Sequence, residues 1–182
     1  MIRTFRAAAI AVATFGCALA IGTGIGAPAP GIAAPVVSVP AFSGTLDQQV
    51  AAAARVETDD QEQDCLASAV YFEARGEELK GQLAVADVVL NRVASTKYPN
   101  TICEVVEQPW QFSFVNATGR IPEADRSSAA WAKAVAIARI ALAGTARAVD
   151  SDVLWYHADY VSPSWGRRLA RQDKIGVHIF YS

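Results

Sequence analysis

Two glutamates lie where two apolar helical patterns meet, and they are the residues of this sequence best suited to acid–base chemistry. Glu73 completes an i, i+3, i+4, i+7 pattern that starts at Leu66, so a helix that begins near Cys65 carries this carboxylate on its apolar face. Loss of water disfavours a charged carboxylate and raises its pKa, which keeps a general acid protonated near neutral pH. The sequence therefore predicts Glu73 as a general acid.

Glu77 is the second candidate for this role. Gly76 separates it from the first pattern, and glycine commonly ends a helix, so Glu77 and Glu78 are expected in the turn or at the start of the next helix. A turn that folds back would point Glu77 rather than Glu73 into a cleft. A purely structural interpretation also fits the spacing, in which Glu73 pairs with a cation such as Arg92 and Glu77 caps a helix.

Helices are expected to carry these glutamates, and strands are expected near the C-terminus. The predicted helices lie near 65–75, 79–94, 101–107 and 127–143. Two segments rich in β-branched and aromatic residues are predicted strands, at 153–157 and 177–181. The fold class predicted is α+β, mainly α, with a small C-terminal antiparallel sheet.

Six blocks of sequence resemble, in order, the cell-wall hydrolase family that includes the spore-cortex-lytic enzymes. They are YFEARGE at 71–77, GQLAVADVVLNRV at 81–93, YP at 98–99, QFSF at 111–114, WYH at 155–157 and IGVHIFY at 175–181. The resemblance runs from about Cys65 to the C-terminus. It implies a single catalytic domain over 65–182, similar to lysozymes and lytic transglycosylases, with peptidoglycan as its substrate.

The resemblance also implies a mechanism for cutting the glycan strand between N-acetylmuramic acid and N-acetylglucosamine. A protonated Glu73 would deliver its proton to the glycosidic oxygen and, once deprotonated, take a proton from the muramic 6-hydroxyl, which gives a 1,6-anhydro product. Hydrolysis would instead need a second carboxylate as nucleophile or water activator. Glu77 is the candidate for that second group.

Substrate contacts are expected from two aromatic segments. In the first segment, Gln111 and Ser113 are predicted to bond sugar hydroxyl or acetamido groups, and Phe112 to offer a stacking face, with one phenylalanine of QFSF packed inside the domain. In the second, Tyr156, His157 and Trp165 are predicted to line the cleft. His178 is expected to be structural.

Two other kinds of function fit parts of the sequence. His157 and His178 with Glu73 would supply ligands for a zinc-dependent amidase or peptidase of the stem peptide, but neither histidine lies in a metal-ligand motif. No metal or cofactor is therefore expected. A non-catalytic wall-binding module is the remaining alternative.

The first 64 residues differ in composition from the rest of the chain. Residues 1–20 begin with Arg3 and Arg6, continue with an uncharged apolar run and end in Ala18-Leu19-Ala20, as in a secretory signal peptide. An uncleaved membrane anchor is the alternative and the only membrane contact expected. Residues 21–64 are expected to be a linker, first rich in Ala, Pro and Gly and then acidic and solvated. We expect export to the periplasm or cell envelope.

Cysteine content and charge support this interpretation. Removal of the signal would leave two of the three cysteines, Cys65 and Cys103, and an oxidising compartment favours a disulfide between them. The formal net charge of the whole chain is −2, and the excess acid lies in the segment before Cys65. A nearly neutral domain makes nucleic acid an unexpected partner.

Overall fold

The computed structural model describes residues 42–54, 60–115 and 119–182, which fall within one unit of the chain. Its helices are α1 Leu46–Ala53, α2 Gln61–Ala74, α3 Leu79–Ala94, α4 Ile102–Val106 and α5 Ala129–Ala143, with a 3-10 helix η1 at Ser164–Arg167. Its strands are β1 Trp155–Ala158, β2 Arg171–Ile175 and β3 His178–Tyr181. The predicted signal peptide, 1–20, and the predicted linker up to residue 41 lie outside the described residues.

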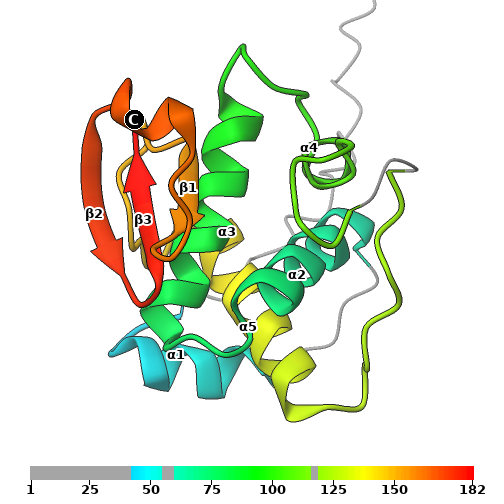
Figure 1. The fold of residues 1–182 in the computed structure, drawn as a ribbon. Helices are drawn as coiled ribbons and strands as arrows, with labels where there is room; N and C mark the ends of the chain where they lie inside the picture. Colours follow the sequence, from blue (N-terminus) through cyan, green and yellow to red (C-terminus); the bar gives the residue numbers. More distant parts are fainter. Residues whose placement is uncertain (1–41, 55–59, 116–118) are drawn as a thin grey trace, which may run out of the picture. The chain divides into compact units, whose positions relative to one another are not determined.

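The strands form one antiparallel sheet in the order β1-β3-β2, and the helices pack on one side of it. Figure 1 shows α3 between this sheet and the other long helices. The predicted class, mainly α with a small C-terminal antiparallel sheet, is confirmed. Within the described residues, no helix is both long enough and apolar enough to cross a membrane.

Helix α3 is buried on two sides. Leu83 and Val89 join the core formed with α2, α4 and α5, whereas Ala84 and Val88 pack against Phe180 of the sheet. A helix that is apolar around most of its circumference belongs in the interior. The sheet and the helical core are therefore joined through α3.

Polar side chains of α3 hold the irregular segment that leads into β1. The Asn91 amide donates to the carbonyls of Asp150 and Val153 (2.8 and 3.0 Å). The Arg92 guanidinium donates to the carbonyl of Leu154 (2.9 Å). The Asp87 carboxylate accepts from the backbone N–H of Ala148 (2.6 Å). All three side chains are buried. Burial raises the pKa of Asp87, and the backbone donors oppose that rise.

The folded unit begins before the boundary expected at Cys65. Helix α1 packs against α5, with Ala53 fully buried and its carbonyl accepting from Arg139 (2.6 Å). The acids expected to be solvated also make specific contacts, since Asp64 pairs with Arg126 (2.7 Å) and the Glu62 carboxylate accepts from the backbone of Ile102. The sequence did not reveal these partners because they lie far along the chain.

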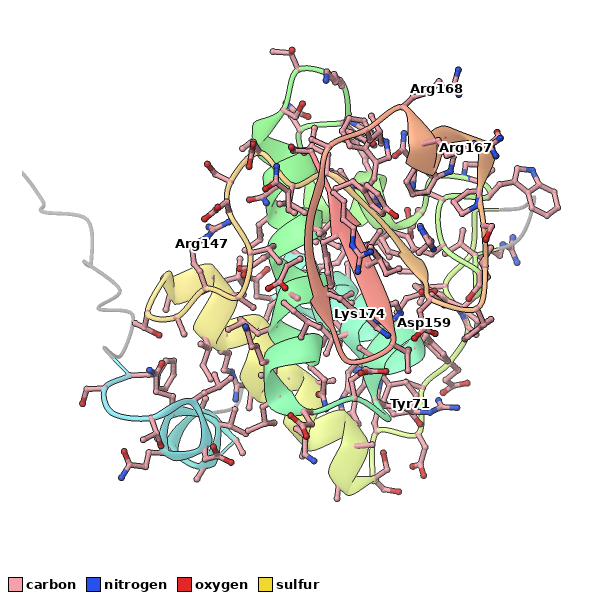
Figure 2. The ribbon with its side chains drawn as sticks, turned by 60° about the vertical axis from the view of Figure 1, so that its left-hand side comes forward. Tyr71, Arg147, Asp159, Arg167, Arg168 and Lys174 are labelled. Atoms are coloured by element: carbon pink, nitrogen blue, oxygen red, sulfur yellow. A yellow bond between two sulfur atoms is a disulfide. The ribbon has the colours of Figure 1, made fainter. Side chains whose placement is uncertain are left out.

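The strand β2 was not predicted. Its sequence, Arg171–Ile175, carries four exposed residues and lacks a run of β-branched residues. Charged side chains are typical of edge strands, which they protect from pairing with other chains. Figure 2 shows Lys174 of β2 directed toward Asp159, to which it is paired at 2.7 Å.

A disulfide joins Cys65 of α2 to Cys103 of α4, as predicted, with 5.2 Å between the Cα atoms. It closes a loop with a sequence separation of 38 residues. A covalent closure of this length removes conformational freedom from the unfolded chain, which stabilises the folded state by about 4 kcal/mol in the chain-entropy model. The bond also fixes α4 on α2.

Replacing both cysteines, Cys65→Ala with Cys103→Ala, should lower the free energy of unfolding by about 4 kcal/mol. Urea denaturation under oxidising conditions measures this change. Dithiothreitol should destabilise the unsubstituted protein to a similar extent and leave the double variant unaffected. Equal stability of the two proteins without reductant would contradict the prediction.

Candidate functional site

A pocket of about 530 Å3 opens between the end of α2, the segment 110–113 after α4, and the residues from β1 to η1. This volume is in the range of small-molecule binding sites. Aromatic rings form much of its wall. Its polar lining comes from Glu73, Arg92, Gln111, Ser113, His157 and His178.

Glu73 lies in the last turn of α2 and is the single carboxylate among the described residues that line this pocket. Its Oε1 atom accepts from the Ser113 hydroxyl (2.9 Å) and the Ser113 backbone N–H (3.2 Å). Its Oε2 atom accepts from the Tyr156 hydroxyl (3.3 Å). Three donors from two distant segments therefore converge on one half-buried carboxylate.

Tyr156 of β1 reaches Glu73 from the sheet side of the pocket. Burial and the neighbouring charge of Glu73 raise the pKa of Tyr156 well above its ordinary value, so the phenol keeps its proton and serves as a donor. Its ring packs edge-on against His178, with 5.1 Å between the centroids, and in a tilted arrangement against Phe180. The sheet thus fixes the direction of the hydroxyl.

Arg92 lies at the base of the pocket with only 3% of its surface exposed. Its guanidinium stacks near the rings of Tyr98 and Phe112, at 5.2 and 5.4 Å. The Gln111 amide is oriented with Oε1 toward Arg92, because its NH2 group would otherwise face guanidinium donors, and Oε1 then accepts from both Nη atoms at 3.2 Å. The Gln111 NH2 group then points away from these guanidinium donors.

Both ring nitrogens of His157 already have partners. Nδ1 lies 2.8 Å from the Ala158 carbonyl, which only accepts, so Nδ1 carries the proton. Nε2 then accepts from the Tyr181 hydroxyl at 2.9 Å. Trp165 packs edge-on against the same imidazole, with 5.5 Å between the centroids. His157 is thus held as part of the wall.

The residues considered for zinc do not form a ligand set. His157 uses both nitrogens in protein hydrogen bonds, which leaves it no lone pair for a metal. Throughout the described part of the chain, no group of three or more His, Cys, Asp or Glu side chains is arranged to hold a metal ion.

Five of the six predicted substrate contacts meet at this pocket, and Phe112 does not. Its ring is 3% exposed and packs against Phe114 in the core, so it is the phenylalanine of QFSF that lies inside. The prediction that Phe112 contacts substrate is therefore wrong. Other lining residues were not predicted, including Trp110, Tyr160 and Arg92. For Trp110 and Tyr160 the available signal was an aromatic residue in the same two segments.

The chain matches a family of known proteins over most of this region. A family model described as Cell Wall Hydrolase matches residues 76–181, more than half of the chain. The chain belongs to the cell wall hydrolase family. The matched region begins at Gly76, after Glu73, so the family model includes the sheet and the pocket wall but leaves out the end of α2.

Related sequences and structures point to the same family. The chain is 37% identical over 115 residues to a spore cortex-lytic enzyme of Bacillus cereus and 36% identical over 118 residues to that of Bacillus subtilis, in each case over 63% of this chain. It spans 42% and 35% of the lengths of these curated relatives.

Two solved structures of catalytic domains are similar to this chain. The catalytic domain of the germination-specific lytic transglycosylase SleB from Bacillus anthracis matches with a TM-score of 0.56 and 35% identity, over 70% of this chain and all of that one. The catalytic domain of SleB from Bacillus cereus matches with a TM-score of 0.54 and 34% identity, over 70% of this chain and 94% of that one.

Glu77, the second acid candidate, does not line the pocket. Its Oε2 atom accepts from the backbone N–H of Val177 at 3.4 Å, in the turn between β2 and β3. Gly176 in that turn has φ +57°, and a Cβ atom there would come within 1.7 Å of Glu77 Oε2. The carboxylate and the glycine therefore fit together as a contact between the start of α3 and the hairpin.

Gly176→Ala should lower the free energy of unfolding by about 1–3 kcal/mol, because alanine is strained at this φ and its Cβ displaces Glu77. Adding Glu77→Ala should recover part of the loss, with a coupling free energy of about 1 kcal/mol in a double-mutant cycle followed by urea denaturation.

Gly76→Ala is the matched control for this cycle, since nothing lies within 4 Å of a Cβ atom there and its φ lies outside the positive range that strains other residues. It should leave stability nearly unchanged. Strictly additive effects of Gly176→Ala and Glu77→Ala would contradict the proposed contact.

His178 of β3 is buried beneath the pocket, with 5% of its surface exposed and, among the described residues, no hydrogen-bond partner at Nδ1. Burial lowers the pKa of His178 from its ordinary value of 6.5, although Glu77, Glu73 and Asp159 oppose this and His157 adds to it. The unfolded chain therefore binds this proton at a higher pH than the folded protein does. Above pH 6.5, titration of His178 does not reduce the free energy of unfolding. As the pH falls below 6.5 toward the lower pKa of the folded protein, the free energy of unfolding decreases.

His178→Phe, which keeps a ring and removes the titrating group, should reduce the loss of stability between about pH 6.5 and pH 5. The difference in slope should approach, and not exceed, about 1.4 kcal/mol per pH unit. Urea denaturation at intervals across this range measures it. Parallel pH profiles of the variant and the unsubstituted protein would show that His178 does not contribute.

Proposed function

We propose that this chain cuts the glycan strand of peptidoglycan between N-acetylmuramic acid and N-acetylglucosamine, as a lytic transglycosylase with Glu73 as its general acid and base. The observation that carries the proposal is a single carboxylate, held by three donors, in a pocket lined by aromatic rings. Hydrolysis needs a second carboxylate in reach of the same bond, and Glu77 is bonded to the hairpin instead. The SleB domain from Bacillus anthracis, which belongs to a germination-specific lytic transglycosylase, supports the same chemistry.

In the first step, the protonated Glu73 transfers its proton to the glycosidic oxygen as the C1–O bond of the muramic sugar breaks. The bonding pair stays on that oxygen, which becomes the 4-hydroxyl of N-acetylglucosamine. Positive charge develops at C1 of the muramic sugar. The resulting Glu73 carboxylate is stabilised by the donors of Ser113 and Tyr156.

In the second step, the Glu73 carboxylate takes the proton from the 6-hydroxyl of the same muramic sugar. The 6-oxygen then bonds to C1 and closes a 1,6-anhydro ring. Glu73 ends the cycle protonated, and no water molecule is consumed. One group thus serves as acid and then as base.

The rest of the wall suits a sugar substrate. The Gln111 NH2 group, fixed by Arg92, offers donors to a hydroxyl or acetamido oxygen. Tyr156, His157 and Trp165 present rings beside Glu73. Such a wall combines apolar faces with a few placed polar groups, which is typical of small-molecule and sugar sites.

An exported location follows from this substrate. We propose that residues 1–20 direct export to the periplasm or cell envelope, where an oxidising environment suits the Cys65–Cys103 disulfide. An uncleaved residue 1–20 segment would tether the enzyme to the membrane instead.

The experiment is digestion of purified peptidoglycan sacculi, with the soluble muropeptides identified by mass spectrometry. The unsubstituted protein should release fragments with 1,6-anhydromuramic ends, and Glu73→Gln should lower the rate by at least about 100-fold while keeping the melting temperature. Removal of the proton donor alone explains that loss, because glutamine keeps the shape.

Glu77→Gln is the matched control, and it should retain anhydro product formation. An inactive Glu77→Gln with an active Glu73→Gln would reverse the assignment of the acid. Reducing muramic or glucosamine ends would indicate hydrolysis, and stem peptides whose release stops in EDTA would indicate a metal-dependent amidase.

A further inference from the structure

Trp110 has a backbone conformation that tryptophan seldom adopts. Its φ is +67°, in the left-handed region, and every other described residue with positive φ is a glycine. A bulky residue at positive φ is a genuine outlier, because its Cβ crowds the neighbouring backbone. Strained residues of this kind cluster at functional sites, where the strain is accepted for what the side chain does.

The ring of Trp110 makes no contribution to packing that would explain its position. It is 78% exposed, and among the described residues no other ring and no cation packs against it. The other three tryptophans all have such partners: Trp131 with Tyr71, Trp155 with Lys97 and Trp165 with His157. Neither stability nor backbone preference therefore accounts for tryptophan here.

A second exposed ring lies at the same pocket. Tyr160 is 83% exposed and comes from the turn after β1, far from Trp110 in sequence, and both residues line the pocket that holds Glu73. Asp159, the residue before Tyr160, ties the turn to the β2–β3 hairpin through its ion pair with Lys174 (2.7 Å; Figure 2) and the hydrogen bond from its backbone N–H to the Val177 carbonyl (2.7 Å). Tyr160 is therefore presented on an ordered turn.

The exposed apolar side chains gather at this pocket. Of the five large hydrophobic residues exposed in the described chain, Trp110, Tyr160 and Val161 line it, while Leu142 and Val177 do not. An exposed apolar patch continuous with a pocket marks a binding surface. A flat aromatic face suits the apolar C–H face of a pyranose, because the negative face of the aromatic ring attracts the weakly positive hydrogens of the sugar.

We propose that Trp110 and Tyr160 form an additional sugar subsite at the rim of the pocket, which holds a pyranose ring of the glycan strand beside the residues flanking the cleaved bond. The subsite rests on the proposed function and makes it depend on strand length: a longer strand gains the rim contact, and a disaccharide at Glu73 does not. Trp110 is thereby a specificity-determining residue and takes no part in proton transfer.

Binding of N-acetylglucosamine oligomers to the full chain carrying Glu73→Gln tests this, because the measurement does not depend on turnover. Isothermal titration should give tighter binding of the tetrasaccharide than of the disaccharide. Adding Trp110→Gly should weaken tetrasaccharide binding about tenfold and leave disaccharide binding unchanged. Tyr160→Ala should act in the same direction.

Glycine is the informative replacement because it relieves the left-handed backbone. The melting temperature of Trp110→Gly should equal or exceed that of its parent. Trp110→Ala should weaken tetrasaccharide binding to the same extent, but its melting temperature should be lower than that of Trp110→Gly. Leu142→Ala, an exposed apolar residue of α5 outside the pocket, is the matched control and should bind both oligomers normally.

Several outcomes would overturn the subsite. Two concern binding: equal affinities for the two oligomers, or no binding of the tetrasaccharide at millimolar concentration. Two concern Trp110→Gly: a loss of stability, or a change of oligomeric state. A change of oligomeric state would make the rim a contact between copies of the chain. Anhydro product from sacculi with unchanged length dependence in Trp110→Gly would reject the subsite and keep the proposed function. Length-dependent binding by the Glu73→Gln chain, with no anhydro product from sacculi treated with the unsubstituted chain, would keep the subsite and reject the proposed function.

Discussion

Three buried polar side chains of α3 form hydrogen bonds with the backbone before β1, and the position of the sheet depends on these bonds. Asn91, Arg92 and Asp87 would each be costly to bury without partners. The segment 148–154 has no regular structure to satisfy its own carbonyl and N–H groups, and it supplies those partners. Because β1 follows directly, these bonds set the strand that carries Tyr156.

The position of Glu73 in the pocket depends on the same arrangement. Glu73 stands at the end of α2, and its donors arrive from the loop after α4 and from β1. No two of these segments are neighbours in the sequence. Arg92 contacts both segments: its Nε donates to the backbone before β1, and its Nη atoms orient Gln111 in the pocket wall. Helix α3 thus bonds to both walls of the pocket through Arg92.

The disulfide acts on the other wall. By fixing α4 on α2, the Cys65–Cys103 bond holds the origin of the segment that carries Trp110, Gln111 and Ser113. This segment lacks regular structure, so its shape relies on the anchors at its two ends. On the opposite side, Glu77 and Gly176 join α3 to the β2–β3 hairpin. The acid that the sequence offered as a catalytic alternative therefore supports the sheet.

The sequence by itself determined the fold class, three of the long helices, two of the strands and the cysteine pair. Those features are recorded locally, in the apolar spacing from Leu66 to Glu73, in the cap at Ser128 and in the β-branched and aromatic run at 177–181. It also indicated α4 and, through family resemblance, most of the pocket wall. Strand β2 was not predicted because four of its five residues are exposed. Helix α1 was not predicted because it is eight residues long, with four of them exposed, in a segment that was expected to be a linker.

Only the tertiary structure placed Glu73 in the pocket and Glu77 against the hairpin, placed Phe112 in the core and brought Arg92 and Trp110 to the pocket. Helical spacing gives the face on which a carboxylate lies, but not which distant segment covers that face. The donors of Glu73 are 40 and 83 residues away along the chain, and the partner of Glu77 is 100 residues away. Contacts over such separations follow from how the elements pack together, which no local pattern of residue types records.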